Sequence, residues 1–252
     1  MSILITKNPS TEMDVRMVPV PEATRSYTPM PHADLIDTIE VQLKHHLPQY
    51  NIHSKQFGLA RDGDQMFGMI SLKKEPEYVD VEIVDPDDNL DLSIGFRNSY
   101  DKSMSVGVVG GGKVFICDNM MMHSDAIKIM KRHTKNVMRE FDYMLYTSIP
   151  ELENQFVTIV DAKKQLGGVE IEHEQGYEFL GRMFGHKLLT PVQMSSAVED
   201  WRSPNFEVFK ERSAWSLYNA ATWGLKKGSP SLAMNRYCNA HDWFMDNLNR
   251  LQ

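Results

Sequence analysis

Cysteine and long apolar runs are scarce in this 252-residue sequence, and each absence excludes a class of protein. Its two cysteines, Cys117 and Cys238, are far apart and form no metal-ligand spacing, which indicates neither a disulfide framework nor a zinc site. The sequence contains no run of about 18 apolar residues, so it predicts no membrane helix. The N-terminal apolar segment is too short for a signal peptide. We therefore expect a cytoplasmic protein with no membrane partner.

Motifs of common enzyme classes are also absent. The sequence has no Walker loop, no Gly-x-Ser-x-Gly elbow and no His-Glu-x-x-His pair, and Gly107–Gly112 does not fit a dinucleotide-binding motif. A metal-dependent nuclease site could be assembled from Asp101, Lys102, Asp118 and His123, although their spacing does not require one. We predict no catalytic residue, no metal ligand and no cofactor, and favour a protein that is not an enzyme.

Charge is unevenly distributed along the chain, whose formal net charge is −7. Residues 75–91 carry eight acidic side chains and no basic one, which is typical of a solvated strand face with an acidic turn. Residues 97–139 carry eight basic side chains and three acidic ones, so one basic segment stands out from an acidic protein. Such a segment can attract a polyanion even when the whole chain repels it.

The first half of the chain has the pattern of an α+β fold. Residues 1–31 are proline-rich and predict an extended arm, with a short strand around 13–20. A helix is expected from His32 to Leu47, closed by Pro48. A hairpin follows over 52–72 with its turn at Arg61–Asp64, and further strands are expected at 78–84 and 90–96.

The stretch from Ser93 to Asn119 is the most distinctive part of the sequence. Apolar residues alternate on both sides of Gly110-Gly111-Gly112, which predicts a hairpin with a glycine turn. The polar run Arg97–Ser103 precedes it. Two interpretations stay open: a turn whose polar side chains bond their own backbone, or a contact surface for phosphate with Arg97 and Lys102 as its cations.

From Ser124 the spacing predicts one long helix with a cationic stripe, on which Lys128, Arg132, Lys135 and Arg139 align. A charged stripe is by default a solvated face, but this one follows the basic hairpin directly. Further helices are expected over 169–184, 191–201, 214–224 and 234–251, with Thr190 as an N-cap before Pro191. We divide the chain into an arm (1–31), an α+β core (32–148) and a helical C-terminal region packed on that core (149–252).

Five separated motifs carry a resemblance, and they occur in order over residues 27–250: His32–Leu35, Phe96–Ser103, Val114–Asn119, Lys131–Thr134 and Ala214–Ala220. Together they resemble a family of phage- and plasmid-related proteins of unknown function. This resemblance implies an origin in a mobile element and supplies no activity. The order helix, antiparallel hairpins, basic helix is similar to the core of single-strand annealing proteins, which form rings or filaments and need no nucleotide cofactor.

We therefore predict a single-stranded DNA-binding or annealing protein of phage or mobile-element recombination, acting as a homo-oligomer in the host-cell cytoplasm. Phe96 or Tyr100 would offer a stacking face. The alternatives are a phage interaction or assembly protein that docks to a host or phage protein, and a nuclease. The residues expected to contact the nucleic acid are Arg97, Asn98, Tyr100, Lys102, Lys113, Lys128, Lys131, Arg132, Lys135 and Arg139.

Overall fold

The chain folds around a seven-stranded antiparallel sheet, in a computed structural model that describes residues 9–78, 90–114, 119–122 and 127–251. The strands run in the order β1-β2-β3-β4-β5-β6, and β7 also pairs with β5. Their bounds are β1 Pro9–Ser10, β2 Tyr50–Ala60, β3 Gln65–Lys74, β4 Leu90–Ser99, β5 Val106–Val114, β6 Asn119–Met121 and β7 Lys128–Lys131. The expected strand at 78–84 lies almost wholly outside the described residues.

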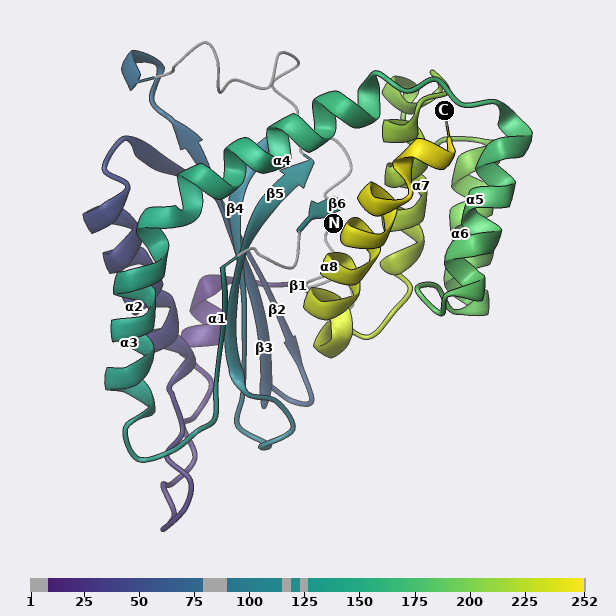
Figure 1. The fold of residues 1–252 in the computed structure, drawn as a ribbon. Helices are drawn as coiled ribbons and strands as arrows, with labels where there is room; N and C mark the ends of the chain where they lie inside the picture. Colours follow the sequence, from purple (N-terminus) through teal and green to yellow (C-terminus); the bar gives the residue numbers. More distant parts are fainter. Residues whose placement is uncertain (1–8, 79–89, 115–118, 123–126, 252) are drawn as a thin grey trace.

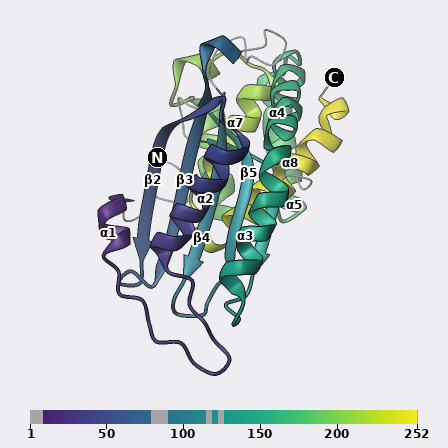
Figure 2. The ribbon, with the colours of Figure 1, turned by 90° about the vertical axis from the view of Figure 1, so that its left-hand side faces the viewer.

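Helices occupy most of the C-terminal half, so the predicted α+β class is confirmed. The helices are α1 Glu12–Arg16, α2 His32–His46, α3 Val137–Ser148, α4 Leu152–Gly167, α5 His173–Gly185, α6 Pro191–Arg202, α7 Ala214–Leu225 and α8 Pro230–Asp246. Figure 1 shows α2, α3 and the start of α4 along one face of the sheet, with α5–α8 grouped on the other side. Figure 2 shows α2 and α3 side by side over the strands.

The predicted glycine turn is wrong, because Gly110, Gly111 and Gly112 lie inside the continuous strand β5. The turn that joins β4 to β5 lies at residues 100–105 instead. A Cβ atom on Gly110 would stand 2.5 Å from Leu152 Cδ2, and one on Gly112 would stand 2.9 Å from Ile159 Cγ2. The glycines therefore let α4 approach the sheet closely, a requirement of packing that resembles a turn signal in the sequence.

The predicted long basic helix is also wrong. Its first part is strand β7, which pairs with Val106–Val109 of β5, and a loop at 132–136 separates β7 from α3. Ile127 and Ile129 are buried while Lys128 between them is exposed, which is the two-residue alternation of a strand. Pairing with β5 satisfies the backbone polar groups of this short segment, which overrides its helical spacing. The basic side chains consequently do not align on one helix.

Most of the other helices and strands lie close to where the sequence predicts them. Helix α2 and the β2–β3 hairpin lie where they were predicted, and Thr190 caps α6 in a capping box with Gln193. The expected strand near residues 13–20 is wrong, because Glu12–Arg16 form α1. Helix α5 begins later than predicted, at His173, and α8 runs from Pro230 to Asp246. One continuous hydrophobic core extends from the sheet into the C-terminal helices.

Candidate nucleic-acid interface

The polar motif at the end of β4 is the centre of a buried hydrogen-bond network. Asn98 is fully buried, and its Nδ2 donates to the Met30 carbonyl at 2.7 Å and to His32 Nδ1 at 2.9 Å. The backbone N–H of His32 donates to the Tyr100 hydroxyl at 2.8 Å, and the two rings stack 3.9 Å apart. The network therefore fastens the arm before α2 to the sheet, which is a structural role for these residues.

His32 is held neutral by this network. Its Nδ1 accepts from the Asn98 amide, so the proton lies on Nε2, which donates to the Gly63 carbonyl at 3.0 Å. The pKa of His32 is lowered to about 4, chiefly by burial and to a smaller extent by the nearby His133, against the opposing effect of the hydrogen bond to Gly63. The hydrogen bonds of this site consequently need an unprotonated His32.

The turn after β4 is closed by its own side chains, as the first of the two sequence interpretations expected. Ser99 Oγ accepts from the Met104 N–H and donates to the Met104 carbonyl, both at 3.0 Å. Asp101 accepts from the Ser103 N–H at 3.0 Å and from Arg61 Nη1 at 3.2 Å. Asn98 departs from that interpretation because it bonds the distant arm and not its own turn.

Two predicted phosphate contacts, Arg97 and Lys113, are buried on the sheet face that is turned away from α4. Arg97 is 8 % exposed, and its guanidinium reaches Met130 Sδ of β7 at 4.0 Å. Lys113 is 4 % exposed and lies directly opposite Asp91 in the register of β4 and β5, so the two charges share one face. Burial lowers the pKa of Arg97. With Asn98 and Tyr100, these residues are inaccessible to a bound strand, which is a correction to the predicted interface.

The remaining predicted cations lie at the surface, on the turn after β4 and on the segment from β7 to the start of α3. Lys131 forms an ion pair with Glu140 at 2.5 Å, and Lys102 lies with its ammonium 4.7 Å from the centre of the Tyr27 ring. Four others are exposed and have no carboxylate within 4.0 Å in the described part of the chain: Lys128, Arg132, Lys135 and Arg139. These four lie between the start of β7 and the first turn of α3, and we call them the basic segment.

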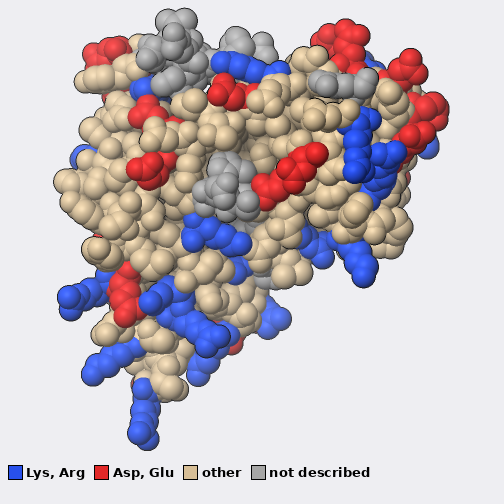
Figure 3. All heavy atoms as spheres, in the orientation of Figure 1, with Lys and Arg blue, Asp and Glu red and all other residues tan. Residues whose placement is uncertain are grey.

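The basic segment belongs to a wider positive end of the molecule. Figure 3 shows Lys and Arg side chains gathered at the lower end, over the strand turns and the loop between β7 and α3, while several acidic side chains lie along the upper edge. Arg25 of the arm and Arg61 of the β2–β3 turn are also exposed. An acidic chain therefore gathers basic side chains at one end, where they can attract a polyanion.

Exposed aromatic side chains lie near these charges on α3, a segment for which no stacking residue was predicted from the sequence. The predicted stacking residues Phe96 and Tyr100 are buried, which removes both from the surface. Tyr143 is 68 % exposed and Tyr146 is 50 % exposed. Arg139, Tyr143 and Tyr146 are spaced by four and three residues, so they share one face of α3. That spacing was the signal that could have revealed them.

The described residues give no support to a metal centre. They contain no group of three His, Cys, Asp or Glu side chains that could hold a metal ion. Asp101 is engaged by Arg61, Gln65 and Ser103, whereas Asp118 and His123 of the nuclease hypothesis lie outside the described residues.

Comparison with known proteins identifies no relative: no family model, no curated protein and no solved structure matches this chain. No described helix is long and apolar enough to cross a membrane. With no relative to indicate a function, the geometry of the positive end is what points to one.

Proposed function

We propose that the chain binds single-stranded DNA through the basic segment and the exposed tyrosine face of α3, and that it acts as an annealing protein without a nucleotide cofactor. The observation that carries this proposal is the run of exposed cations without carboxylate partners among the described residues, which continues through Arg139 into α3, the helix that carries the exposed rings of Tyr143 and Tyr146. The resemblance to phage- and plasmid-related proteins favours a role in mobile-element recombination, in the cytoplasm of the host cell.

The basic segment would supply the phosphate contacts. Arg132, Lys135 and Arg139 extend from the loop after β7 into the first turn of α3, within eight residues of chain. Cations without internal partners lose no ion pair when they bind phosphate, and they gain the free energy of counterion release. The chain as a whole carries a net charge of −7, so such contacts must be confined to this end.

The exposed tyrosines of α3 would supply base stacking. A single strand exposes the faces of its bases, and stacking on an aromatic ring contributes about 1–3 kcal/mol per base without sequence preference. Tyr143 and Tyr146 follow Arg139 along one face of α3. A duplex keeps its base faces covered, and this arrangement therefore favours single strands. Assembly of several copies into a ring or filament would place many such faces in one groove.

The test is fluorescence anisotropy of a labelled single-stranded oligonucleotide and of a matched duplex over a salt series, with EDTA present. We expect salt-dependent binding that favours the single strand. The triple variant Arg132→Ala/Lys135→Ala/Arg139→Ala should bind at least tenfold more weakly. Its salt slope should fall by about 2, because each lost contact with single-stranded phosphate removes about 0.7.

A matched control variant removes three exposed cations outside the positive end: Lys164→Ala/Lys187→Ala/Lys210→Ala. It changes the net charge equally and should bind as the unaltered chain does. If both triple variants lose affinity equally, the loss comes from the change in net charge, and the proposed site is wrong. No binding at low salt would reject the nucleic-acid function and favour an interaction or assembly protein, whereas metal-dependent cleavage without EDTA would favour a nuclease.

A further inference from the structure

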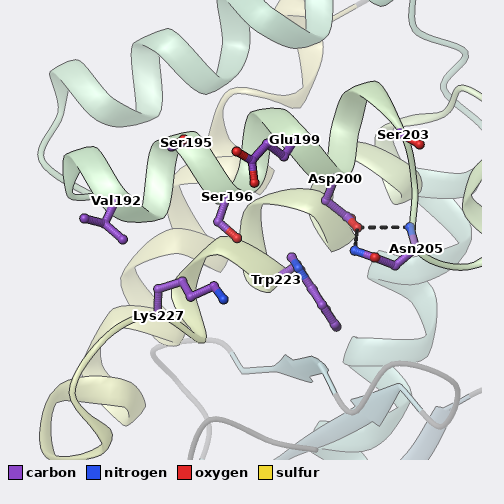
Figure 4. Close-up of a pocket in the computed structure, with 9 residues that line it drawn as sticks. All are labelled: Val192, Ser195, Ser196, Glu199, Asp200, Ser203, Asn205, Trp223 and Lys227. Atoms are coloured by element: carbon purple, nitrogen blue, oxygen red, sulfur yellow. Dashed lines mark hydrogen bonds between the residues drawn. The ribbon is translucent and has the colours of Figure 1, made fainter.

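A pocket of about 590 Å³ lies among the C-terminal helices, between α6, α7 and the loop that follows α6. This volume falls in the range of small-molecule sites, about 300–1,000 Å³. Figure 4 shows Ser196, Glu199 and Asp200 of α6 around the pocket, with Trp223 of α7 and Lys227 facing them. None of these residues belongs to the positive end of the molecule.

Two polar residues of the pocket have unused hydrogen-bonding capacity at atoms that are accessible from it. Ser196 is 8 % exposed, and its hydroxyl has no hydrogen-bond partner among the described residues. Asp200 is 5 % exposed, and its Oδ1 accepts both the N–H of Asn205 at 3.2 Å and the side-chain amide of Asn205 at 2.5 Å. Its Oδ2 accepts no hydrogen bond within the described chain. Neither atom is among the buried polar atoms that lack a partner, so a molecule in the pocket can reach both of them.

The two groups are adjacent on one face of α6, because Ser196 and Asp200 are four residues apart. An ionised carboxylate only accepts hydrogen bonds, while a hydroxyl both donates and accepts. The ligand must therefore present an N–H or O–H donor to Asp200, next to a group that can pair with the Ser196 hydroxyl.

The opposite wall of the pocket is aromatic. Trp223 is half-buried and lines the pocket, and Phe206 packs edge-on against its indole with the ring centres 5.9 Å apart. The Lys226 ammonium lies 4.3 Å from the centre of the same ring. Neither Phe206 nor Lys226 lines the pocket, so both hold the indole from outside and leave its pocket side for a flat ligand.

We propose that this pocket binds a nucleobase with an exocyclic amino group, of the adenine or cytosine type. The amino group donates to Asp200 Oδ2, the neighbouring ring nitrogen accepts from the Ser196 hydroxyl, and the base packs on Trp223. Uracil and thymine place a carbonyl oxygen where adenine and cytosine carry the amino group, and two acceptors would then face each other. Lys227 lies at the rim, where the sugar or a phosphate of a nucleotide would emerge.

Calorimetric titration of the full chain with adenosine, cytidine and uridine tests this site. Adenosine and cytidine should bind, and uridine should bind at least tenfold more weakly. Ser196→Ala should weaken adenosine binding about fivefold, the effect of one lost hydrogen bond. Thr158→Ala, at an exposed position of α4, should change nothing. Equal binding of all three nucleosides, or binding of none, would overturn the proposal.

Asp200→Asn makes a sharper test. The variant keeps an oxygen that accepts from Asn205 and places an N–H₂ donor where Oδ2 stands, so the preference should invert toward uridine. An unchanged preference in a folded variant would contradict the assigned role of Asp200. If Asp200→Asn does not fold, the Ser196→Ala titration still decides the proposal. This site is independent of single-strand binding, since the triple variant of the basic segment should bind adenosine normally.

Discussion

The strand pair β4–β5 and the segment from β7 to α3 are both rich in polar and basic residues, yet the fold uses them in opposite ways. Every residue of β4 and β5 is buried, the charged Asp91, Arg97 and Lys113 included. In the segment 128–139 four basic side chains project from the surface without described carboxylate partners. Burial with partners marks the first region as structural, and exposure without partners marks the second as available for binding.

The difference teaches that polar density in a sequence does not by itself locate a binding surface. Asn98 and Tyr100 belong to a polar motif that has the composition of a ligand-binding loop. Their side chains instead form hydrogen bonds with the backbone of Met30 and His32, at the junction of the arm and α2. Substitutions in β4–β5 should therefore change the free energy of unfolding, whereas substitutions in the basic segment and on α3 should change affinity for DNA.

Replacing the central amide of the buried network should have the largest effect. Asn98→Leu keeps the approximate shape but leaves the Met30 carbonyl and His32 Nδ1 without their donor. We expect a loss of about 3 kcal/mol in the free energy of unfolding, measured by urea denaturation. Ser103→Ala, in the exposed turn nearby, should cost no more than about 0.5 kcal/mol. If Asn98→Leu is as stable as the unaltered chain, the network is not structural.

Acid should weaken the same network. The pKa of His32 is about 4 in the folded chain and 6.5 in the unfolded chain, so the unfolded state binds more protons between these values. His32 therefore contributes its full stability above pH 6.5, and this contribution of about 3 kcal/mol is lost as the pH falls toward 4. Denaturation of the unaltered chain and of His32→Gln across this range should give converging stabilities. Parallel pH profiles would show that His32 titrates normally.

Close packing of β5 against α4 should be the next most sensitive feature. Gly110→Ala places a methyl group 2.5 Å from Leu152 Cδ2, and the overpacking should cost about 1–3 kcal/mol in thermal or urea denaturation. Gly181→Ala is the matched control, because that glycine lies in α5 with no atom within 4 Å of its added Cβ. The control should gain about 0.5–1 kcal/mol from helix propensity. Equal effects at both sites would contradict the packing role of Gly110.

The smallest effect on the fold is expected on α3. Tyr143→Ala removes an exposed ring, so the stability should change by no more than about 0.5 kcal/mol. Affinity for a single-stranded oligonucleotide should fall about fivefold or more, and affinity for duplex should not change. Tyr143→Phe, which keeps the ring, should bind normally. A fivefold loss in Tyr143→Phe as well would assign the effect to the hydroxyl and not to stacking.

Much of the secondary structure could be predicted because it rests on local signals. The apolar spacing of α2, the Arg61–Asp64 turn and the Thr190 cap each depend on neighbouring residues alone. The role of Gly110 and Gly112 in β5 could not be predicted from the sequence. These glycines make room for Leu152 and Ile159, which lie some 40 residues away along the chain. Strand β7 was misassigned for a similar reason, as its partner β5 overrides the helical spacing of a short segment.

For the candidate site, the sequence by itself determined that the positive charge is concentrated between residues 97 and 139, because composition along the chain is independent of the fold. Only the tertiary structure decided which of those charges reach solvent. Pairing of β4 with β5 buries Arg97 and Lys113, while the edge position of β7 and the loop before α3 leave the basic segment exposed. Burial depends on what the rest of the chain places over a residue, and no local pattern contains that information.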